Sequence, residues 1–179
     1  MTGKKKRRAV IALAAISTGF VTAITPSSAA FAACDARPKV TTQYTFKDKK
    51  HTSLATNLKS AWVEGPANIT YTKTATSTVS AQVTATVSAE AGIVFAKASS
   101  SLGVTVGASY SKSEQWSYSK NVPKGKDGQL RMYHDALGFT VTKKVWDGSR
   151  CDFRHVYTSK VVAPKKTGED YWKLVTRKS

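Results

Sequence analysis

Between Val79 and Phe95 the chain alternates strictly between apolar and polar residues. Every odd-numbered position in this stretch is Val, Ala, Ile or Phe, and every even position up to Glu90 is Ser, Thr, Gln or Glu. A period of two residues is that of a β-strand, because successive side chains of a strand point to opposite faces. The run from Ile69 to Phe95 is rich in Thr, Val and Ser and is therefore predicted to be one long strand.

The phase of this alternation changes between Phe95 and Ala98. Beyond it the even positions carry the apolar residues as far as Tyr110, while the odd positions are Lys, Ser, Thr or Gly. Such a change is typical of a hairpin tip or of a bulge next to one. We therefore expect a second strand that starts near Ala98 and continues to Val122.

Shorter elements are predicted on both sides of this hairpin. Upstream, the pattern indicates a strand over Val40–Phe46, a turn at Asp48–His51 and a short helix over Thr52–Ser60 that ends before Gly65-Pro66. Downstream, it indicates strands over Gln129–His134, Phe139–Trp146 and Phe153–Val162, separated by turns at Pro123–Gly125, Lys126–Gly128 and Asp147–Gly148. The segment after Lys165 is expected to end in another strand or to fray. The expected fold class is all-β: an elongated antiparallel sheet or sandwich with one long amphipathic Ser/Thr/Val-rich β-hairpin over about residues 70–122.

The first 32 residues have the pattern of a secretory signal peptide. A basic run from Lys4 to Arg8 precedes an apolar run over Ala9–Ile24, and Ala30-Phe31-Ala32 fits the small-residue cleavage site. We therefore predict a secreted, extracellular protein with a single β-rich domain over residues 33–179. Removal of the five basic residues in the leader lowers the net charge from +17 to +12. A basic protein of this kind is attracted to anionic membrane or cell-wall surfaces, and no specific nucleic-acid partner is predicted.

The two cysteines, Cys34 and Cys151, are predicted to form a disulfide after export. A lipobox around Cys34 is the alternative, and lipidation there would leave Cys151 without its partner. Candidate chemistry is sparse elsewhere. The three histidines show no metal-ligand spacing, and no nucleophile or phosphate-binding motif is present. We expect neither catalysis nor a cofactor.

The length of the alternating run separates two interpretations. Seventeen residues extend about 55 Å at ~3.3 Å per residue, whereas a tilted strand needs only about 9–11 residues to cross the hydrocarbon core of a bilayer. Membrane barrels show the same alternation, with apolar side chains toward lipid and polar ones toward the lumen. Two long strands of an ordinary β-sandwich would show it as well, with one face on the core and the other in water.

Three segments together carry a family resemblance: ITYTKTATSTVSAQVTATVSAEAG, SSSLGVTVGASYSKSEQWSYSKNVPKGKDGQLRMYH and FTVTKKVW. Over about Thr70–Trp146 the chain resembles the pore-forming module of aerolysin-like toxins, in particular the epsilon-toxin and mosquitocidal-toxin type. It is also similar to a group of small secreted actinobacterial proteins. The chain differs from these toxins in leaving little room for a receptor-binding domain.

The resemblance implies a homo-oligomer in which each subunit inserts one hairpin, with arms near 79–95 and 98–110, into a shared β-barrel. The face toward lipid would consist of Val79, Ala81, Val83, Ala85, Val87, Ala89, Leu102, Val104, Val106 and Ala108. The lumen face would consist of Ser80, Gln82, Thr84, Thr86, Ser88, Thr105 and Ser109. The tip would be Ile93, Val94 and Phe95, with Trp116 and Tyr118 as interface aromatics. The alternative is a non-catalytic envelope or surface-binding protein in which the hairpin never inserts.

Overall fold

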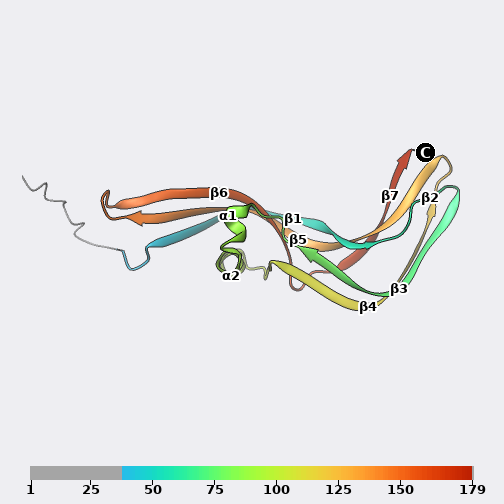
Figure 1. Ribbon diagram of the computed structural model, residues 1–179, viewed down its shortest axis with the longest axis horizontal. Helices are drawn as coiled ribbons and strands as arrows, with labels where there is room; N and C mark the ends of the chain where they lie inside the picture. The colour runs from blue at the N-terminus through green and yellow to red at the C-terminus, as the bar shows by residue number, and fades with distance from the viewer. Residues whose placement is uncertain (1–37, 179) are drawn as a thin grey trace, which may run out of the picture. The chain divides into compact units, whose positions relative to one another are not determined.

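The computed structural model describes residues 38–178 and is dominated by antiparallel β-strands (Figure 1). Its elements in chain order are β1 (Thr42–Lys59), β2 (Val63–Glu64), β3 (Ala67–Ser80), α1 (Ala85–Ser88), α2 (Ala91–Leu102), β4 (Ser109–Val122), β5 (Lys126–Asp147), β6 (Asp152–Pro164) and β7 (Asp170–Lys178). The all-β fold class is thus confirmed, with two short helices added. The predicted signal peptide and Cys34 lie outside the described residues.

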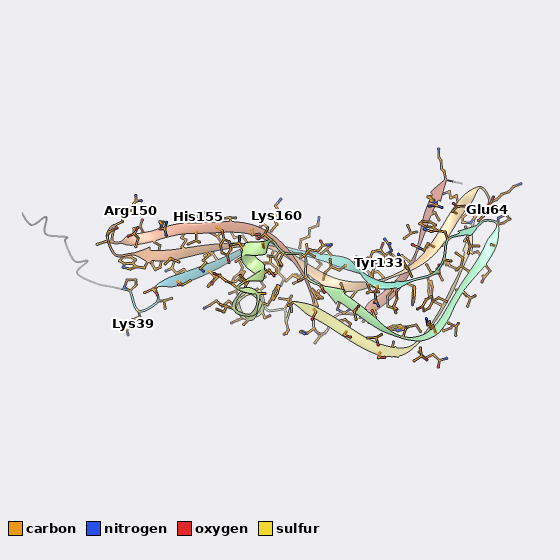
Figure 2. The ribbon with its side chains drawn as sticks, viewed as in Figure 1. Lys39, Glu64, Tyr133, Arg150, His155 and Lys160 are labelled. Carbon is orange, nitrogen blue, oxygen red and sulfur yellow. The ribbon has the colours of Figure 1, made fainter. Side chains whose placement is uncertain are left out.

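The long strand β5 is the centre of the larger sheet. β1 pairs antiparallel with one side of β5, and the two-residue β2 also pairs with it. β6 pairs with residues 136–147 of β5 and β7 with residues 126–134, so these two strands follow one another along β5. The predicted turn at Asp147–Gly148 is confirmed, and Figure 2 marks Arg150 in this β5–β6 turn.

The predicted turn at Asp48–His51 and the predicted helix over Thr52–Ser60 are both wrong, because β1 runs through them as one strand. At Asp48 the strand instead has a β-bulge, where pairing with β5 shifts between Lys47 and Lys50 and Asp48 takes a left-handed φ of 57°. Beyond the bulge, Leu54, Thr56 and Leu58 alternate into the core. Their two-residue period decided the structure over the four-residue spacing of Leu54, Leu58 and Trp62, which had favoured a helix.

A second correction concerns β5. The sequence predicted a turn at Lys126–Gly128 and two separate strands after it, whereas residues 126–147 form one strand. The turn predicted at Pro123–Gly125 is confirmed, because the chain turns at Lys124-Gly125, with Gly125 at a φ of 72°. Gly128 lies inside the strand, at a position where Val122 and Leu174 leave no room for a β-carbon.

The predicted long hairpin is only partly formed. β3 and β4 pair antiparallel from Ala67 opposite Val122 to Ser80 opposite Ser109. Between them, residues 81–108 leave the extended conformation and form α1 and α2. The prediction that the strands continue through Val79–Phe95 and from Ala98 onward is therefore wrong.

Local sequence explains why this segment forms helices despite its alternation. Alanine is the strongest helix former, and the segment is rich in it. The buried residues Val87, Val94, Phe95 and Ala98 also follow a helical spacing, so one helical face is apolar as well. Gly103 ends α2 in a left-handed conformation with a φ of 65°.

The hairpin and the helices pack on opposite faces of β5. Met132 and His134, at even positions, face β3 and β4, whereas Phe139 and Val141, at odd positions, lie in the core under the helices. The extra residue of the bulge between Lys47 and Lys50 belongs to β1, and β5 pairs with β6 without a shift from Ala136 to Lys143, so the change of parity along β5 is a change of face. The segment 81–108 therefore starts from a hairpin on one face of the sheet and packs on the other.

Candidate functional site

The candidate site consists of residues 81–108, which are inserted between β3 and β4, and of the sheet residues that contact them. We call residues 81–108 the inserted segment. The hairpin ladder ends with a bond from the backbone N–H of Ala81 to the carbonyl of Ala108, 2.8 Å long. From there the segment passes the edge of β6, where Gln82 and Val162 exchange two backbone hydrogen bonds of 2.8 and 3.0 Å. It returns past the end of β6, where the N–H of Gly107 donates to the carbonyl of Pro164.

An apolar contact holds the helices on the sheet. Val87, Val94 and Ala98 are fully buried against Leu137, Phe139, Val141, Val161 and Ala163. Each fully buried aliphatic side chain contributes about 1.5–3 kcal/mol relative to exposure. Of these three residues, Val87 is one that the resemblance assigns to the lipid face and Val94 one that it assigns to the tip, and here both cover a protein surface.

Hydrogen bonds and an ion pair of Glu90, which lies between α1 and α2, add to this apolar contact. We call these polar contacts the latch. One carboxylate oxygen accepts hydrogen bonds from the hydroxyls of Tyr44 on β1 (2.8 Å) and Tyr157 on β6 (3.1 Å), and the other pairs with the ammonium of Lys143 on β5. The hydrogen bond from Lys143, with those from the two tyrosines, holds the pKa of Glu90 below its ordinary value. Glu90 therefore binds all three strands as a carboxylate.

A pocket of about 520 Å³ opens beside this latch. It is lined by Lys39, Val40, Thr41, Thr42, Tyr44, Glu90, Ile93, Lys97 and Lys143. Solvent protons can therefore reach the carboxylate of Glu90. A further contact lies at the other end of α2, where the ammonium of Lys49, in the β1 bulge, donates to the carbonyl of Leu102 at 2.7 Å.

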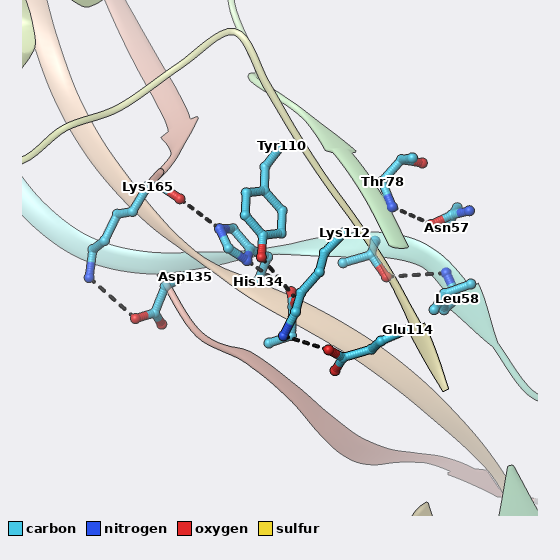
Figure 3. Close-up of polar contacts among 11 residues, drawn as sticks. Asn57, Leu58, Thr78, Tyr110, Lys112, Glu114, His134, Asp135 and Lys165 are labelled. Carbon is cyan, nitrogen blue, oxygen red and sulfur yellow. Dashed lines mark hydrogen bonds and ion pairs between the residues drawn. The ribbon is translucent and has the colours of Figure 1, made fainter. Parts of the chain in front are cut away.

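A buried polar cluster fixes the start of β4 (Figure 3). The ring of Tyr110 stacks on His134 with centroids 3.8 Å apart, and its hydroxyl donates to Asp170. The two ring nitrogens of His134 lie 2.8 Å from the carboxylate of Asp170 and 2.8 Å from the carbonyl of Lys165. The cluster ties the base of the inserted segment to β5 and β7.

The structure places the predicted lipid-face residues in three kinds of position. Val79 is the last core residue of β3, while Ala81, Val83, Val104, Val106 and Ala108 lie in the linkers to the helices. Ala85 and Val87 belong to α1, Ala89 follows it, and Leu102 ends α2. Val87 and Val106 are buried, whereas Ala85 and Ala89 are exposed.

The predicted lumen residues and tip are divided in the same way. Ser80 and Ser109 close the hairpin, Gln82, Thr84 and Thr105 lie in the linkers, and Thr86 and Ser88 lie on the exposed side of α1. The predicted tip residues all lie in α2, where Val94 and Phe95 are buried and Ile93 is 54% exposed.

The two predicted interface aromatics, Trp116 and Tyr118, pack against the core of the protein. Trp116 is buried against Leu58 and Met132 and donates its indole N–H to the carbonyl of Ala75 at 2.9 Å. Tyr118 is half-buried beside Trp172, with ring centroids 6.2 Å apart. Their contacts in the folded form are those of core side chains.

Sequence reasoning missed the residues that hold the segment in place. Glu90 is the one acidic residue between positions 79 and 110, and this isolation was the available signal. Its partners Tyr44, Lys143 and Tyr157 are distant in sequence, and no local pattern connects them to it. The same holds for the partners of Tyr110.

Comparisons with protein-family models, with curated proteins and with solved structures find no match for this chain. Within residues 38–178, no helix is long and apolar enough to cross a membrane. The same part of the chain contains no group of three or more His, Cys, Asp or Glu side chains arranged to hold a metal ion.

Proposed function

We propose that this is a secreted, non-catalytic, aerolysin-like pore-forming protein, in which residues 81–108 leave the sheet and extend the β3–β4 hairpin into an oligomeric membrane barrel. One observation carries the proposal: the register of the hairpin, continued through the helical segment, matches apolar with apolar and polar with polar positions. The apolar and polar positions of residues 81–108 thus alternate in register with those of β3 and β4, as a longer hairpin would require.

The register is fixed by the pairs that exist. Val79 lies opposite Tyr110 and Ser80 opposite Ser109. The same spacing, continued without a bulge, brings Val83 opposite Val106 and Val87 opposite Leu102. Directly opposite residues of an antiparallel pair share a face, so these positions form one apolar stripe.

The other face of the extended hairpin is polar along its whole length. In the existing ribbon it is formed by exposed Ser, Thr, Asn and Gln side chains on both strands, such as Thr72 opposite Ser117 and Thr76 opposite Ser113. Continuation adds Thr84 opposite Thr105 and Ser88 opposite Ser101. This register pairs each odd position of one arm with an even position of the other and puts the turn at Val94-Phe95. It therefore explains why the apolar residues change from odd to even positions near Phe95.

The apolar stripe has the length that a bilayer requires. It runs from Val79 to Ile93 on one arm and from Ala96 to Tyr110 on the other, with Ser100 as the polar exception. Fifteen residues extend about 50 Å, and a tilt of about 45° brings this to roughly 35 Å, against a hydrocarbon core of about 30 Å. The charged residues Lys112 and Glu114 on the same face lie just outside the stripe.

A second candidate function rests on a different surface. The ammonium of Lys173 lies 5.1 and 5.0 Å from the ring centroids of Tyr133 and Tyr171. Tyr133, labelled in Figure 2, is at an odd position of β5 and so lies on the face turned away from the hairpin. Together with Arg131 this makes a basic and aromatic surface. It favours a surface-binding protein whose inserted segment never leaves the sheet.

A disulfide staple distinguishes the two functions. Gln82 and Val162 form a hydrogen-bonded antiparallel pair, for which Cα atoms lie about 5.5 Å apart, within the range that a disulfide bridges. We expect the Gln82→Cys/Val162→Cys variant to fold, to release no dye from liposomes while oxidised, and to recover release after reduction. Each single cysteine variant, and the wild type with and without reductant, are the controls.

The proposed function fails if the wild-type protein releases no dye from vesicles or cells of any composition tested. It also fails if the oxidised staple, verified by mass, releases dye as fast as the reduced form. The first result would favour the surface-binding function, and the second would mean that dye release does not need the segment to leave the sheet.

A further inference from the structure

We propose that Glu90 and Lys97 set the ion selectivity of the pore, as two rings of opposite charge at the far mouth of an otherwise uncharged lumen. This inference rests on the proposed function and deepens it. It assigns a role to the two charged residues of the inserted segment, one of which serves a different purpose in the folded form.

The parity of the hairpin places both residues on the polar face. That face takes the even positions of the first arm, which include Glu90, and the odd positions of the second, which include Lys97. The remaining positions of this face, from Asn68 through the turn to Asn121, are Ser, Thr, Asn, Gln or Gly, with Val94 and Phe95 at the turn itself. The other charged residues of the hairpin lie on the opposite face: Lys73, Lys112, Glu114 and Lys120.

The continued register also sets their depth and their spacing. Glu90 falls opposite Ser99, and Lys97 falls opposite Gly92, so the two are diagonal neighbours about 7–8 Å apart. Glu90 is eleven residues beyond Val79, which is about the length of strand that crosses a bilayer. Both side chains therefore emerge at the end of the lumen nearest the turn.

Release from the sheet frees Glu90 for this role. In the folded form its carboxylate is occupied by Tyr44, Tyr157 and Lys143, none of which belongs to the inserted segment. Lys97 lies with its ammonium 5.8 Å from the centroid of the Tyr44 ring. When the segment extends, Glu90 and Lys97 both lose these partners on the sheet. Within the extended hairpin they can then form an ion pair with each other, because they are diagonal neighbours.

Repetition in every subunit turns each residue into a ring, and rings of charged side chains select ions by sign. With both rings present the opposite charges offset one another, and the wild-type pore is weakly selective. Removal of one ring leaves the other without its counter-charge. Glu90→Gln is therefore expected to favour anions and Lys97→Gln to favour cations.

The test is the reversal potential of pores in a planar bilayer under a KCl gradient, from which the permeability ratio of K⁺ to Cl⁻ follows. We expect Glu90→Gln to lower this ratio and Lys97→Gln to raise it, each by about twofold or more at low salt. The double variant returns toward the wild-type value. Glu114→Gln and Lys112→Gln are matched controls, because they make the same changes of charge on the opposite face of the same hairpin.

Pores whose permeability ratio is unchanged by both Glu90→Gln and Lys97→Gln overturn this inference and leave the proposed function intact. The same conclusion follows if the two control variants shift the ratio as much as the two lumen variants do. Absence of any conductance from the wild type overturns the proposed function, and this inference with it.

Discussion

Glu90 is the residue through which the inserted segment contacts β1, β5 and β6 at once. It combines two hydroxyl donors with an ammonium, and hydrogen bonds to a charged group contribute about 1.5–3 kcal/mol each. The partner is affected too: the hydrogen bond to Glu90 raises the pKa of Lys143, so the pair stays ionised over a wide pH range. A single carboxylate thus influences whether α1 and α2 stay on the sheet.

Acid is expected to weaken this latch. The pKa of Glu90 is lowered by folding, so its contribution to stability is complete above its ordinary value of 4.5 and is lost as the pH falls through the lower value of the folded form. Thermal unfolding should show that Glu90→Gln destabilises the protein by about 1–3 kcal/mol at pH 7. The difference in stability between Glu90→Gln and wild type should shrink when the pH falls below the pKa of Glu90 in the folded protein.

Glu114→Gln is the control for this measurement. Glu114 pairs with Lys112 in an exposed salt bridge at 2.8 Å, and such pairs contribute about 0–1 kcal/mol. Equal destabilisation by the two variants, or a gap for Glu90→Gln that does not change with pH, would contradict the latch.

The two cysteines carry a prediction that concerns covalent structure. Cys151 lies in the β5–β6 turn with a φ of 53°, and Cys34 lies outside the described residues. We expect a Cys34–Cys151 disulfide, which on the chain-entropy model stabilises a loop of this size by roughly 4–5 kcal/mol. The intact mass of the protein without residues 1–32 should rise by two alkylations only after reduction. A diacylglyceryl mass on Cys34 would support lipidation instead.

At the scale of elements, residues 81–108 satisfy two periodicities at once. Their alternation suits a strand, while their alanine content and the spacing of Val87, Val94 and Ala98 suit a helix that covers Phe139 and Val141. The balance between the two depends on which apolar surface is available. The sheet provides it in the folded form, and a bilayer would provide it in a barrel.

Adjacent residues on α1 allow a matched test of the barrel. Ala85 and Thr86 are both exposed in the folded form, so lysine at either position should be tolerated there. In the continued hairpin Ala85 faces lipid near mid-depth, where lysine costs about 2–4 kcal/mol per subunit, and Thr86 faces the lumen. We expect Ala85→Lys to abolish dye release and Thr86→Lys to retain most of it, with equal melting temperatures.

Two other outcomes would count against the barrel orientation. One is equal dye release by the two folded lysine variants, which would mean that the faces are not distinguished. The other is selective loss with Thr86→Lys, which would mean that the faces are exchanged. Val83→Lys and Thr84→Lys give the same comparison nearer the base, but Val83 packs against the core and its variant needs a separate folding control.

At the scale of the whole molecule, positive charge is distributed unevenly. The solvent-facing side of the β3–β4 ribbon is uncharged, whereas lysines and arginines are spread over the larger sheet and its turns. If the protein binds an anionic surface, we expect the larger sheet to approach that surface first and the uncharged side of the ribbon to remain in water.

Vesicle co-sedimentation measures this attraction. With a net charge of +12 after removal of residues 1–32, the protein should bind vesicles that contain anionic lipid more strongly than neutral ones. Binding should fall as salt rises, because exposed charges are screened beyond a Debye length of about 8–10 Å. Equal binding to both vesicle types at low salt would exclude charge as the basis of surface association.

Much of the architecture follows from sequence periodicity. The all-β class, the β3–β4 ribbon, the turn at Asp147–Gly148 and the strand over β6 were predictable, because alternation over a half-buried strand is a local property of the chain. The strand faces predicted for residues 81–108 stay a prediction, because the segment contains α1 and α2 in the structure. Where the pattern was locally ambiguous, as in Thr52–Ser60, the prediction failed.

Only the tertiary structure decided the conformation of residues 81–108. An ambivalent segment adopts the form that buries its apolar side chains, and the odd face of β5 offers that burial to a helix. Likewise Glu90 finds Tyr44, Lys143 and Tyr157 because β1, β5 and β6 lie side by side, although the three residues are separated by up to 113 positions in the chain. Sequence determined which residues of this segment are apolar, and the packing of distant strands determined which of them share a buried helical face.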